Sequence, residues 1–204
     1  MGRPREHGPG TRAALLNTAA ALLASEGADA VTVRRVAAES GTTTRAVYSL
    51  FGGKDGMLRA LFREVTETMR RNHLAVPARD DPVEEIAELA AAYRAAARKH
   101  ASLYAHYLGR AAASLRPTAG EIAEAFGVQD RVTDAIRRAV KSGQFPGRTA
   151  EAIAVQLWSL VHGLASIELL GYLGDEQQAA THWRDALAAA LTGYQQPPPR
   201  GPGA

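Results

Sequence analysis

Apolar residues recur at the spacing of an α-helix along most of the chain. In the first such segment, residues 11–26, four of them stand at positions i, i+3, i+4 and i+7 and would share one helix face: Leu16, Ala19, Ala20 and Leu23. Glycine and proline interrupt the pattern and mark the ends of further segments. The pattern predicts about nine helices, over residues 11–26, 32–39, 43–50, 54–73, 82–99, a short segment through 115, 118–142, 149–173 and 176–194.

Residues that favour helix starts support several of these boundaries. Asp81 stands where an N-cap is expected, and Pro82 follows it at the first helical position. Thr118 and Glu121 have the spacing of a capping box. Asp175 is expected to be the N-cap of the last helix.

The composition agrees with an all-α fold. The 204 residues include 42 alanines, alanine being the strongest helix former, and few runs of β-branched residues. The absence of cysteine excludes disulfides and thiolate metal sites. The chain begins without an apolar signal segment, and no window reaches the about 18 uninterrupted apolar residues of a membrane span. We therefore expect a cytoplasmic protein with no membrane contact, no cofactor and no metal.

Positive charge is concentrated in the N-terminal third. Residues 1–75 hold 11 Lys and Arg against 7 Asp and Glu, and residues 76–204 hold 13 against 14. With the Gly- and Pro-rich ends, this predicts a flexible arm over 1–10, a basic domain over 11–75, a second domain over 76–194 and a disordered tail over 195–204. A modest basic excess is by itself weak evidence for a nucleic-acid partner.

The most informative segment of the chain is residues 32–62. Two short predicted helices meet at Gly41, which gives the dimensions of a helix-turn-helix. The second helix has an apolar side with Val47, Leu50 and Phe51, and an outward side with Thr43, Thr44, Arg45 and Ser49. Small hydroxyls allow close approach to a DNA groove, and an arginine can pair with guanine. Thr43 alone could be only a helix cap, but the whole cluster indicates a surface that reads DNA.

One run of residues is specific enough to compare with known proteins: GTTTRAVYSLFGGKDGML, residues 41–58. With Thr11, Gly27 and Thr32 ahead of it, this run resembles the N-terminal domain of the TetR-type repressors, over about residues 11–62. The resemblance implies a three-helix helix-turn-helix domain followed by a helical domain for ligand binding and dimerisation.

The resemblance also implies roles for single residues. Thr32 would contact phosphate, Tyr48 would reach the DNA backbone, and Lys54 would meet a phosphate at the start of its helix. Thr43, Thr44 and Arg45 would reach base edges or nearby phosphates. The chain departs from the family pattern at Gly53 and Gly56, and both would loosen the helix that presents Lys54. Arg3 and Arg5 could reach the minor groove, although a solvated tail is the simpler interpretation.

The C-terminal half carries a shorter likeness. The run WSLVHGLASIEL, residues 158–169, resembles the Trp-x-x-x-His-Gly signature of one TetR C-terminal subfamily. In such proteins the last two helices pair with those of a second copy. The apolar stripe of these helices predicts a homodimer interface, formed by Leu157, Leu160, Val161, Leu164, Trp183, Leu187 and Leu191.

A cavity for a small molecule is expected in the same half. Aromatic and imidazole rings stand there among alanines, so they would project into space bounded by small residues. The candidate lining residues are Tyr93, His100, Tyr104, Tyr107, Phe126, Trp158 and His162. For each ring alone, ordinary core packing is the favoured interpretation, because helical spacing predicts a core position by default.

These observations favour a sequence-specific transcription regulator associated with the nucleoid. We predict a homodimeric repressor that binds double-stranded DNA at a palindromic operator and is released by a small, largely apolar effector. An enzyme is disfavoured, because the chain has no Gly-x-Ser-x-Gly elbow, phosphate loop, cysteine nucleophile or His-x-x-x-His motif. The alternative is a helical module that binds a ligand or a protein but not DNA.

Overall fold

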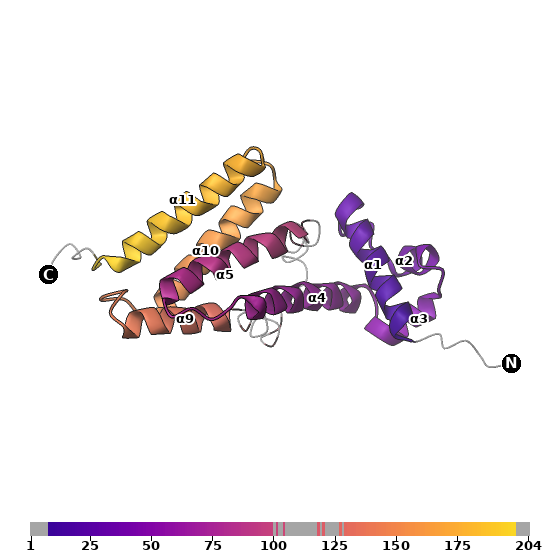
Figure 1. The fold of residues 1–204 in the computed structure, drawn as a ribbon. Helices are drawn as coiled ribbons and strands as arrows, with labels where there is room; N and C mark the ends of the chain where they lie inside the picture. Colours follow the sequence, from indigo (N-terminus) through magenta and orange to yellow (C-terminus); the bar gives the residue numbers. More distant parts are fainter. Residues whose placement is uncertain are drawn as a thin grey trace, which may run out of the picture. The chain divides into compact units, whose positions relative to one another are not determined.

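All regular secondary structure in the described part of the chain is α-helical, as predicted (Figure 1). The computed structural model describes residues 8–99, 101, 104, 118, 120, 127 and 129–198. Its helices with assigned bounds are α1 (Pro9–Glu26), α2 (Val33–Glu39), α3 (Thr44–Phe51), α4 (Lys54–Ala75), α5 (Pro82–Lys99), α9 (Asp130–Lys141), α10 (Ala150–Leu169) and α11 (Glu176–Gln195).

The chain forms two compact units. The first contains the described residues of 1–67 and 100–118, and the second those of 68–99 and 119–204. The division falls inside α4, whereas the sequence suggested a division after residue 75. Each unit is described by itself below.

The first unit is built on α1, α2, α3 and the beginning of α4. Contacts join α1 to α2 and α2 to α3 (Figure 1). The core of the unit is formed by apolar side chains from all four helices, among them Leu15, Leu16, Val36, Val47 and Met57, each at most 1% exposed. Burial of this cluster leaves the polar sides of α2 and α3 in solvent.

The second unit packs α5, α9 and α10 against one another and α11 against α10. Its most deeply buried side chains include Ile86, Leu89, Ile136, Phe145 and Ile153. Tyr194 near the end of α11 packs edge-on against Phe145, with ring centroids 5.7 Å apart. The last helix is therefore part of the core of this unit.

One buried carboxylate connects α5 to α9. Glu85 is 2% exposed and accepts hydrogen bonds from the backbone N–H of Arg79 at 2.9 Å, from Arg131 at 2.9 Å and from Arg138 at 2.5 Å. Burial raises the pKa of Glu85, but these donors outweigh it and hold the pKa below its ordinary value. The carboxylate is therefore charged at neutral pH.

The helix bounds agree with the sequence prediction within a few residues. α1 begins at Pro9, two residues inside the predicted arm, because proline is well suited to a first helical turn. α10 ends at Leu169 instead of residue 173, because Gly171 takes a φ of 80° and its N–H bonds back to Glu168. Asp175 caps α11 as expected, and Gln178 completes a capping box that the sequence analysis did not predict. The capping box expected at Thr118 involves Glu121, which lies outside the described residues.

Within the described residues, α10 is the one helix that is long and apolar enough to cross a membrane by length and composition alone. Only 28% of its most apolar window is buried inside the protein. Core helices of soluble proteins pass the same test, so this property is weak evidence for a membrane. It does show that α10 keeps a large uncovered surface in the single chain.

Candidate functional sites

A surface hollow in the first unit brings together residues from the starts of α2 and α3. Its lining consists of Thr32, Val33, Arg34, Thr44 and Tyr48. Three of the six residues predicted to contact DNA are therefore neighbours in space. Tyr48 is 59% exposed, an unusual state for a large ring that could have joined the core.

Two of the predicted hydroxyls are helix caps as well as surface groups. The Thr32 hydroxyl accepts the backbone N–H of Arg35 at 3.2 Å, and the Thr43 hydroxyl accepts that of Ala46 at 3.2 Å. Each hydroxyl keeps its own proton after accepting one hydrogen bond. Both side chains are exposed, so a cap in this position can still donate to a phosphate oxygen.

The arginines of this region divide into paired and unpaired ones. Arg35 is held by Glu26 at 2.6 Å and by Glu39 at 2.8 Å. Arg34 and Arg45 are exposed and form no ion pair with any described residue. Sequence reasoning missed Arg34. The sequence did distinguish the two arginines. Arg35 has a glutamate four residues later, with which it can pair on a helix, whereas Arg34 has an alanine at that spacing.

Lys54 begins α4 but does not extend freely into solvent. The residue is half-buried, and its ammonium donates to the backbone carbonyl of Ala28 at 2.6 Å. This bond ties the first turn of α4 to the segment between α1 and α2. An ammonium has three protons, so two remain for a partner outside the chain.

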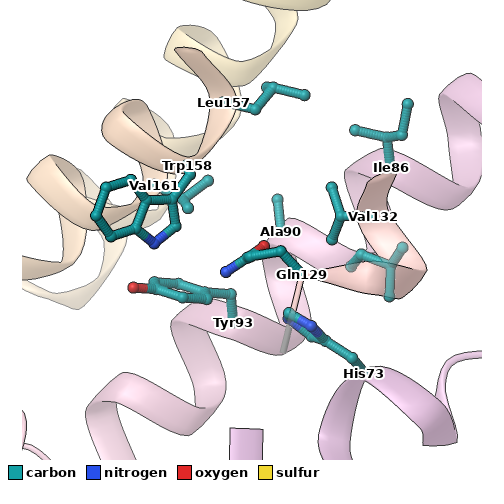
Figure 2. A pocket seen from close by; sticks show the side chains of 10 residues that line it. His73, Ile86, Ala90, Tyr93, Gln129, Val132, Leu157, Trp158 and Val161 are labelled. Carbon is teal, nitrogen blue, oxygen red and sulfur yellow. The ribbon is translucent and has the colours of Figure 1, made fainter. Parts of the chain in front are cut away.

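The second unit contains a narrow cavity between α4, α5, α9 and α10 (Figure 2). The volume open to the centre of a water molecule is about 20 Å³, enough for about one water. The cavity is lined by His73, Ile86, Leu89, Ala90, Tyr93, Gln129, Val132, Leu157, Trp158 and Val161. In this conformation the walls leave no room for a larger molecule.

Two of the predicted cavity residues, Tyr93 and Trp158, line the cavity, and a third touches both. The Tyr93 hydroxyl and His162 Nδ1 are 2.9 Å apart, and the His162 ring lies 4.9 Å from that of Trp158. Burial lowers the pKa of His162, so the imidazole is neutral at pH 7. Tyr104 is buried in the first unit and does not line the cavity. The other three candidates lie outside the described residues: His100, Tyr107 and Phe126.

His73 and Gln129 line the cavity although the sequence analysis did not select them. Figure 2 shows the Gln129 amide between the rings of Tyr93 and His73. A signal for His73 existed, because Val65, Met69 and His73 repeat every four residues along α4 and are all buried. Gln129 precedes α9 and has no comparable pattern, so only the fold reveals its position.

Most of the residues predicted for a dimer interface are buried within the chain itself. Leu160 is half-buried, and the other six are at most 9% exposed: Leu157, Val161, Leu164, Trp183, Leu187 and Leu191. The apolar stripe that suggested an interface is the core face of α10 and α11. The exposed apolar side chains lie on other positions, among them Val155 at 56% and Ile167 at 39%.

A second carboxylate, only partly buried, joins three helices of this unit. Glu168 on α10 accepts three hydrogen bonds from the Arg94 side chain of α5, the shortest at 2.7 Å, and one from Trp183 Nε1 of α11 at 2.6 Å. Burial raises the pKa of Glu168, but the bonds and the charge of Arg94 outweigh it and lower the pKa. Among the described residues, no group of three or more His, Asp or Glu is placed to hold a metal ion.

Comparison with known families gives two matches. The family described as "Bacterial regulatory proteins, tetR family" matches residues 15–61. The family described as "Tetracyclin repressor-like, C-terminal domain" matches residues 86–194, which are more than half of the chain. An uncharacterised helix-turn-helix-type transcriptional regulator of Mycobacterium tuberculosis is 26% identical over 168 residues, which cover 81% of this chain and 73% of the relative.

Solved structures show the same fold. A TetR-family regulator described as putative, from a Rhodococcus species, has a TM-score of 0.74 at 19% identity and covers 88% of this chain and 98% of its own. A TetR variant from Acinetobacter baumannii, solved with minocycline, has a TM-score of 0.62 at 21% identity and covers 92% and 96%. At these identities the structures establish the fold alone.

Proposed function

The chain belongs to the TetR family of bacterial regulatory proteins, a DNA-binding family of transcription regulators, and we propose that this member is an effector-released repressor. The observation that carries the proposal is the hollow in which Thr32, Thr44 and Tyr48 meet beside the unpaired Arg34. Hydroxyl and guanidinium groups that still have donor protons available suit phosphates and base edges. Regulators of this family are generally not enzymes, and we expect this one to be cytoplasmic and associated with the nucleoid.

We assign separate roles to the exposed groups of the first unit. Arg45 and Thr44, on the first turn of α3, read base edges in the major groove, with Thr43 beside them. Thr32 and Tyr48 contact the DNA backbone, together with Lys54, whose ammonium retains two donor protons. The DNA-binding domain in this proposal spans residues 11–75.

The assigned roles predict different losses of DNA affinity for two variants. Arg45→Ala should weaken binding to a preferred duplex and relax the preference at one base pair per half-site. Lys54→Ala should weaken binding to every duplex and reduce the dependence of affinity on salt. Arg63→Ala is the control, because Arg63 is an exposed arginine of α4 outside the hollow.

Duplexes selected by the parent protein from a randomised pool provide the ligand for this test. Binding is measured by fluorescence anisotropy at two salt concentrations for the parent and the variants. A Lys54→Ala variant that binds like the parent would refute the phosphate role. Failure of the parent to select any duplex would leave the alternative, a helical module without DNA binding.

We place the homodimer interface on the exposed face of α10 instead of on its core stripe. Val155, Ser159, Gly163 and Ile167 repeat every four residues and are exposed. Small and apolar residues in such a row allow a second helix to pack closely. A two-fold dimer would place two α3 helices on a palindromic operator.

A charge in this face provides the test of the interface. Val155→Asp should yield monomers in sedimentation, with loss of operator binding. Glu151→Asp, an exposed change at the start of the same helix, should remain dimeric. Dimers of Val155→Asp at micromolar concentration would place the interface elsewhere.

The cavity in the second unit is the proposed effector site. Its lining belongs to the proposed ligand-binding and dimerisation domain, residues 76–194, except for His73 near the end of α4. A small, largely apolar effector fits its lining, and since the cavity is nearly filled, binding must displace a wall. The effector therefore favours a second conformation of the protein, which binds the operator more weakly. The size of the shift is set by the difference between the effector's affinities for the two conformations. The TetR variant from Acinetobacter baumannii that was solved with minocycline supports small-molecule binding by this fold.

Filling the cavity tests this site. Ala90→Leu should abolish release by any metabolite that releases the parent from its duplex, while operator binding persists. Ala91→Leu on the exposed side of α5 is the matched control. Normal release in the Ala90→Leu variant would show that the effector binds elsewhere.

A further inference from the structure

The first turn of α4 contains a glycine whose missing side chain has a structural cause. Glycine is less favourable than alanine inside a helix, and Gly56 has no positive φ that would require it. A Cβ built at Gly56 would lie 1.7 Å from the carbonyl oxygen of Phe51 and 2.8 Å from its carbonyl carbon. Both atoms are backbone, so no side-chain rotation could relieve the collision.

This contact joins α4 directly to the recognition helix. Phe51 is the last residue of α3, and the final carbonyls of a helix have no partner within it. The α-hydrogen of Gly56 takes the position of the absent Cβ and points at the Phe51 oxygen, as in a weak Cα–H···O contact. Gly56 therefore tightens the junction that the sequence led us to expect would be loose.

Other contacts hold the same junction in place. The guanidinium of Arg12 on α1 lies 5.6 Å from the centre of the Phe51 ring and bonds to Glu64 of α4 at 3.3 Å. The half-buried Phe51 side chain packs against the core of the unit. Lys54, two residues before Gly56, is bonded to Ala28. The end of α3 is thus enclosed by α1 on one side and by the start of α4 on the other.

We propose that Gly56 is a positioning residue for DNA binding: its backbone contact with Phe51 sets the placement of α3, although Gly56 itself touches no DNA. The inference rests on the proposed DNA-binding function. A Cβ must move from 1.7 Å to at least 3.0 Å from the Phe51 oxygen, a shift of 1.3 Å. Hydrogen bonds tolerate only a few tenths of an ångström, so a shift of α3 of this size would disrupt the base contacts of Thr44 and Arg45.

Gly56→Ala and Gly52→Ala form a matched pair for the test. Gly52 lies in the same junction at a φ of 76°, and no atom lies within 4 Å of the position that a Cβ would take there. Alanine at Gly52 strains the backbone but collides with nothing. Comparing the two variants therefore separates loss of stability from displacement of α3.

The first readout is binding to a duplex that the parent has selected from a randomised pool. Gly56→Ala should bind it about 10- to 100-fold more weakly, the effect of losing a base contact. Its affinity for a shuffled duplex should change by no more than about threefold, because the charge is unchanged. Gly52→Ala should bind both like the parent at a temperature where each variant is folded. Parental affinity of Gly56→Ala for the selected duplex would overturn the proposal.

The second readout needs no DNA and uses the absence of native cysteines. Spin labels at Ser49→Cys on α3 and Arg63→Cys on α4, both exposed, report the distance between the helices. Gly56→Ala should shift this distance and Gly52→Ala should leave it unchanged. An unshifted distance, or a Gly56→Ala protein with its first unit unfolded, would also overturn the proposal. If the parent selects no duplex, the proposed function fails, and the label distance still decides whether Gly56 places α3.

Discussion

The carboxylate of Glu168 is predicted to be a major source of stability in the second unit. Glu168→Ala would leave the Arg94 side chain, 16% exposed, without its bidentate partner. It would also leave the N–H of Trp183, a residue only 3% exposed, without an acceptor. Removing one partner of a buried ion pair costs about 3–5 kcal/mol. Glu176 lies 3.6 Å from Arg94 and offsets part of the lost charge, so we expect a loss of about 3 kcal/mol, near the lower limit.

Urea denaturation followed by tryptophan fluorescence measures this loss. The chain has two tryptophans, Trp158 and Trp183, and both belong to the second unit. Protein concentration must be held fixed, because the proposed dimerisation would shift the apparent stability. The matched control is Glu176→Ala, which removes an ion pair with Arg98 but from a side chain 61% exposed. Exposed pairs contribute under about 1 kcal/mol.

The comparison of these two variants decides the prediction. Glu168→Ala should unfold at a clearly lower urea concentration than Glu176→Ala, with an unchanged slope of the transition. Equal midpoints for the two variants would refute the reasoning. They would mean that the partly buried network between α5, α10 and α11 contributes no more than a surface ion pair.

Three further outcomes are expected. Burial raises the pKa of Glu85, but hydrogen bonds led by the Arg79 backbone N–H outweigh it and lower the pKa below its ordinary value of 4.5. The contribution of the Glu85 carboxylate to stability is therefore complete above pH 4.5 and is lost on acidification. The stability of a Glu85→Gln variant should depend less on pH in acid, and an unchanged pH dependence would contradict this. Tyr93→Phe removes the hydroxyl bonded to His162 and should cost about 1 kcal/mol in urea denaturation, whereas no change would argue against the bond. Gly171→Ala, at a φ of 80°, should cost about 1–2 kcal/mol, and a thermal melt at the parental temperature would exclude strain there.

The helix bounds and the recognition segment could be predicted because their signals are local. Thr32, Thr43 and Thr149 cap their helices through hydrogen bonds to residues three positions later. Such bonds depend only on neighbouring residues, and sequence spacing reports them directly. The exposed polar side of α3 was predicted on the same basis, from a helical period that separates Val47 from Thr44.

The assignment of faces in the second unit could not be made in this way. The stripe through Leu157 and Leu164 is apolar at helical spacing, and this pattern is the same for a face that meets its own core as for one that meets another chain. The packing of α5 and α9 on α10 decides between them and buries the stripe. The exposed positions Val155 and Ile167 then become the available surface.

By itself the sequence determined the all-α fold, the positions of most helices, the family and the segment that we propose reads DNA, because these depend on short-range spacing and local hydrogen bonds. Only the tertiary structure decided which carboxylates are buried or partly buried and why residue 56 is glycine. Glu168 meets an arginine 74 positions away, and Gly56 meets the end of a preceding helix. Contacts of this kind arise where helices pack, and no periodicity along the chain records them.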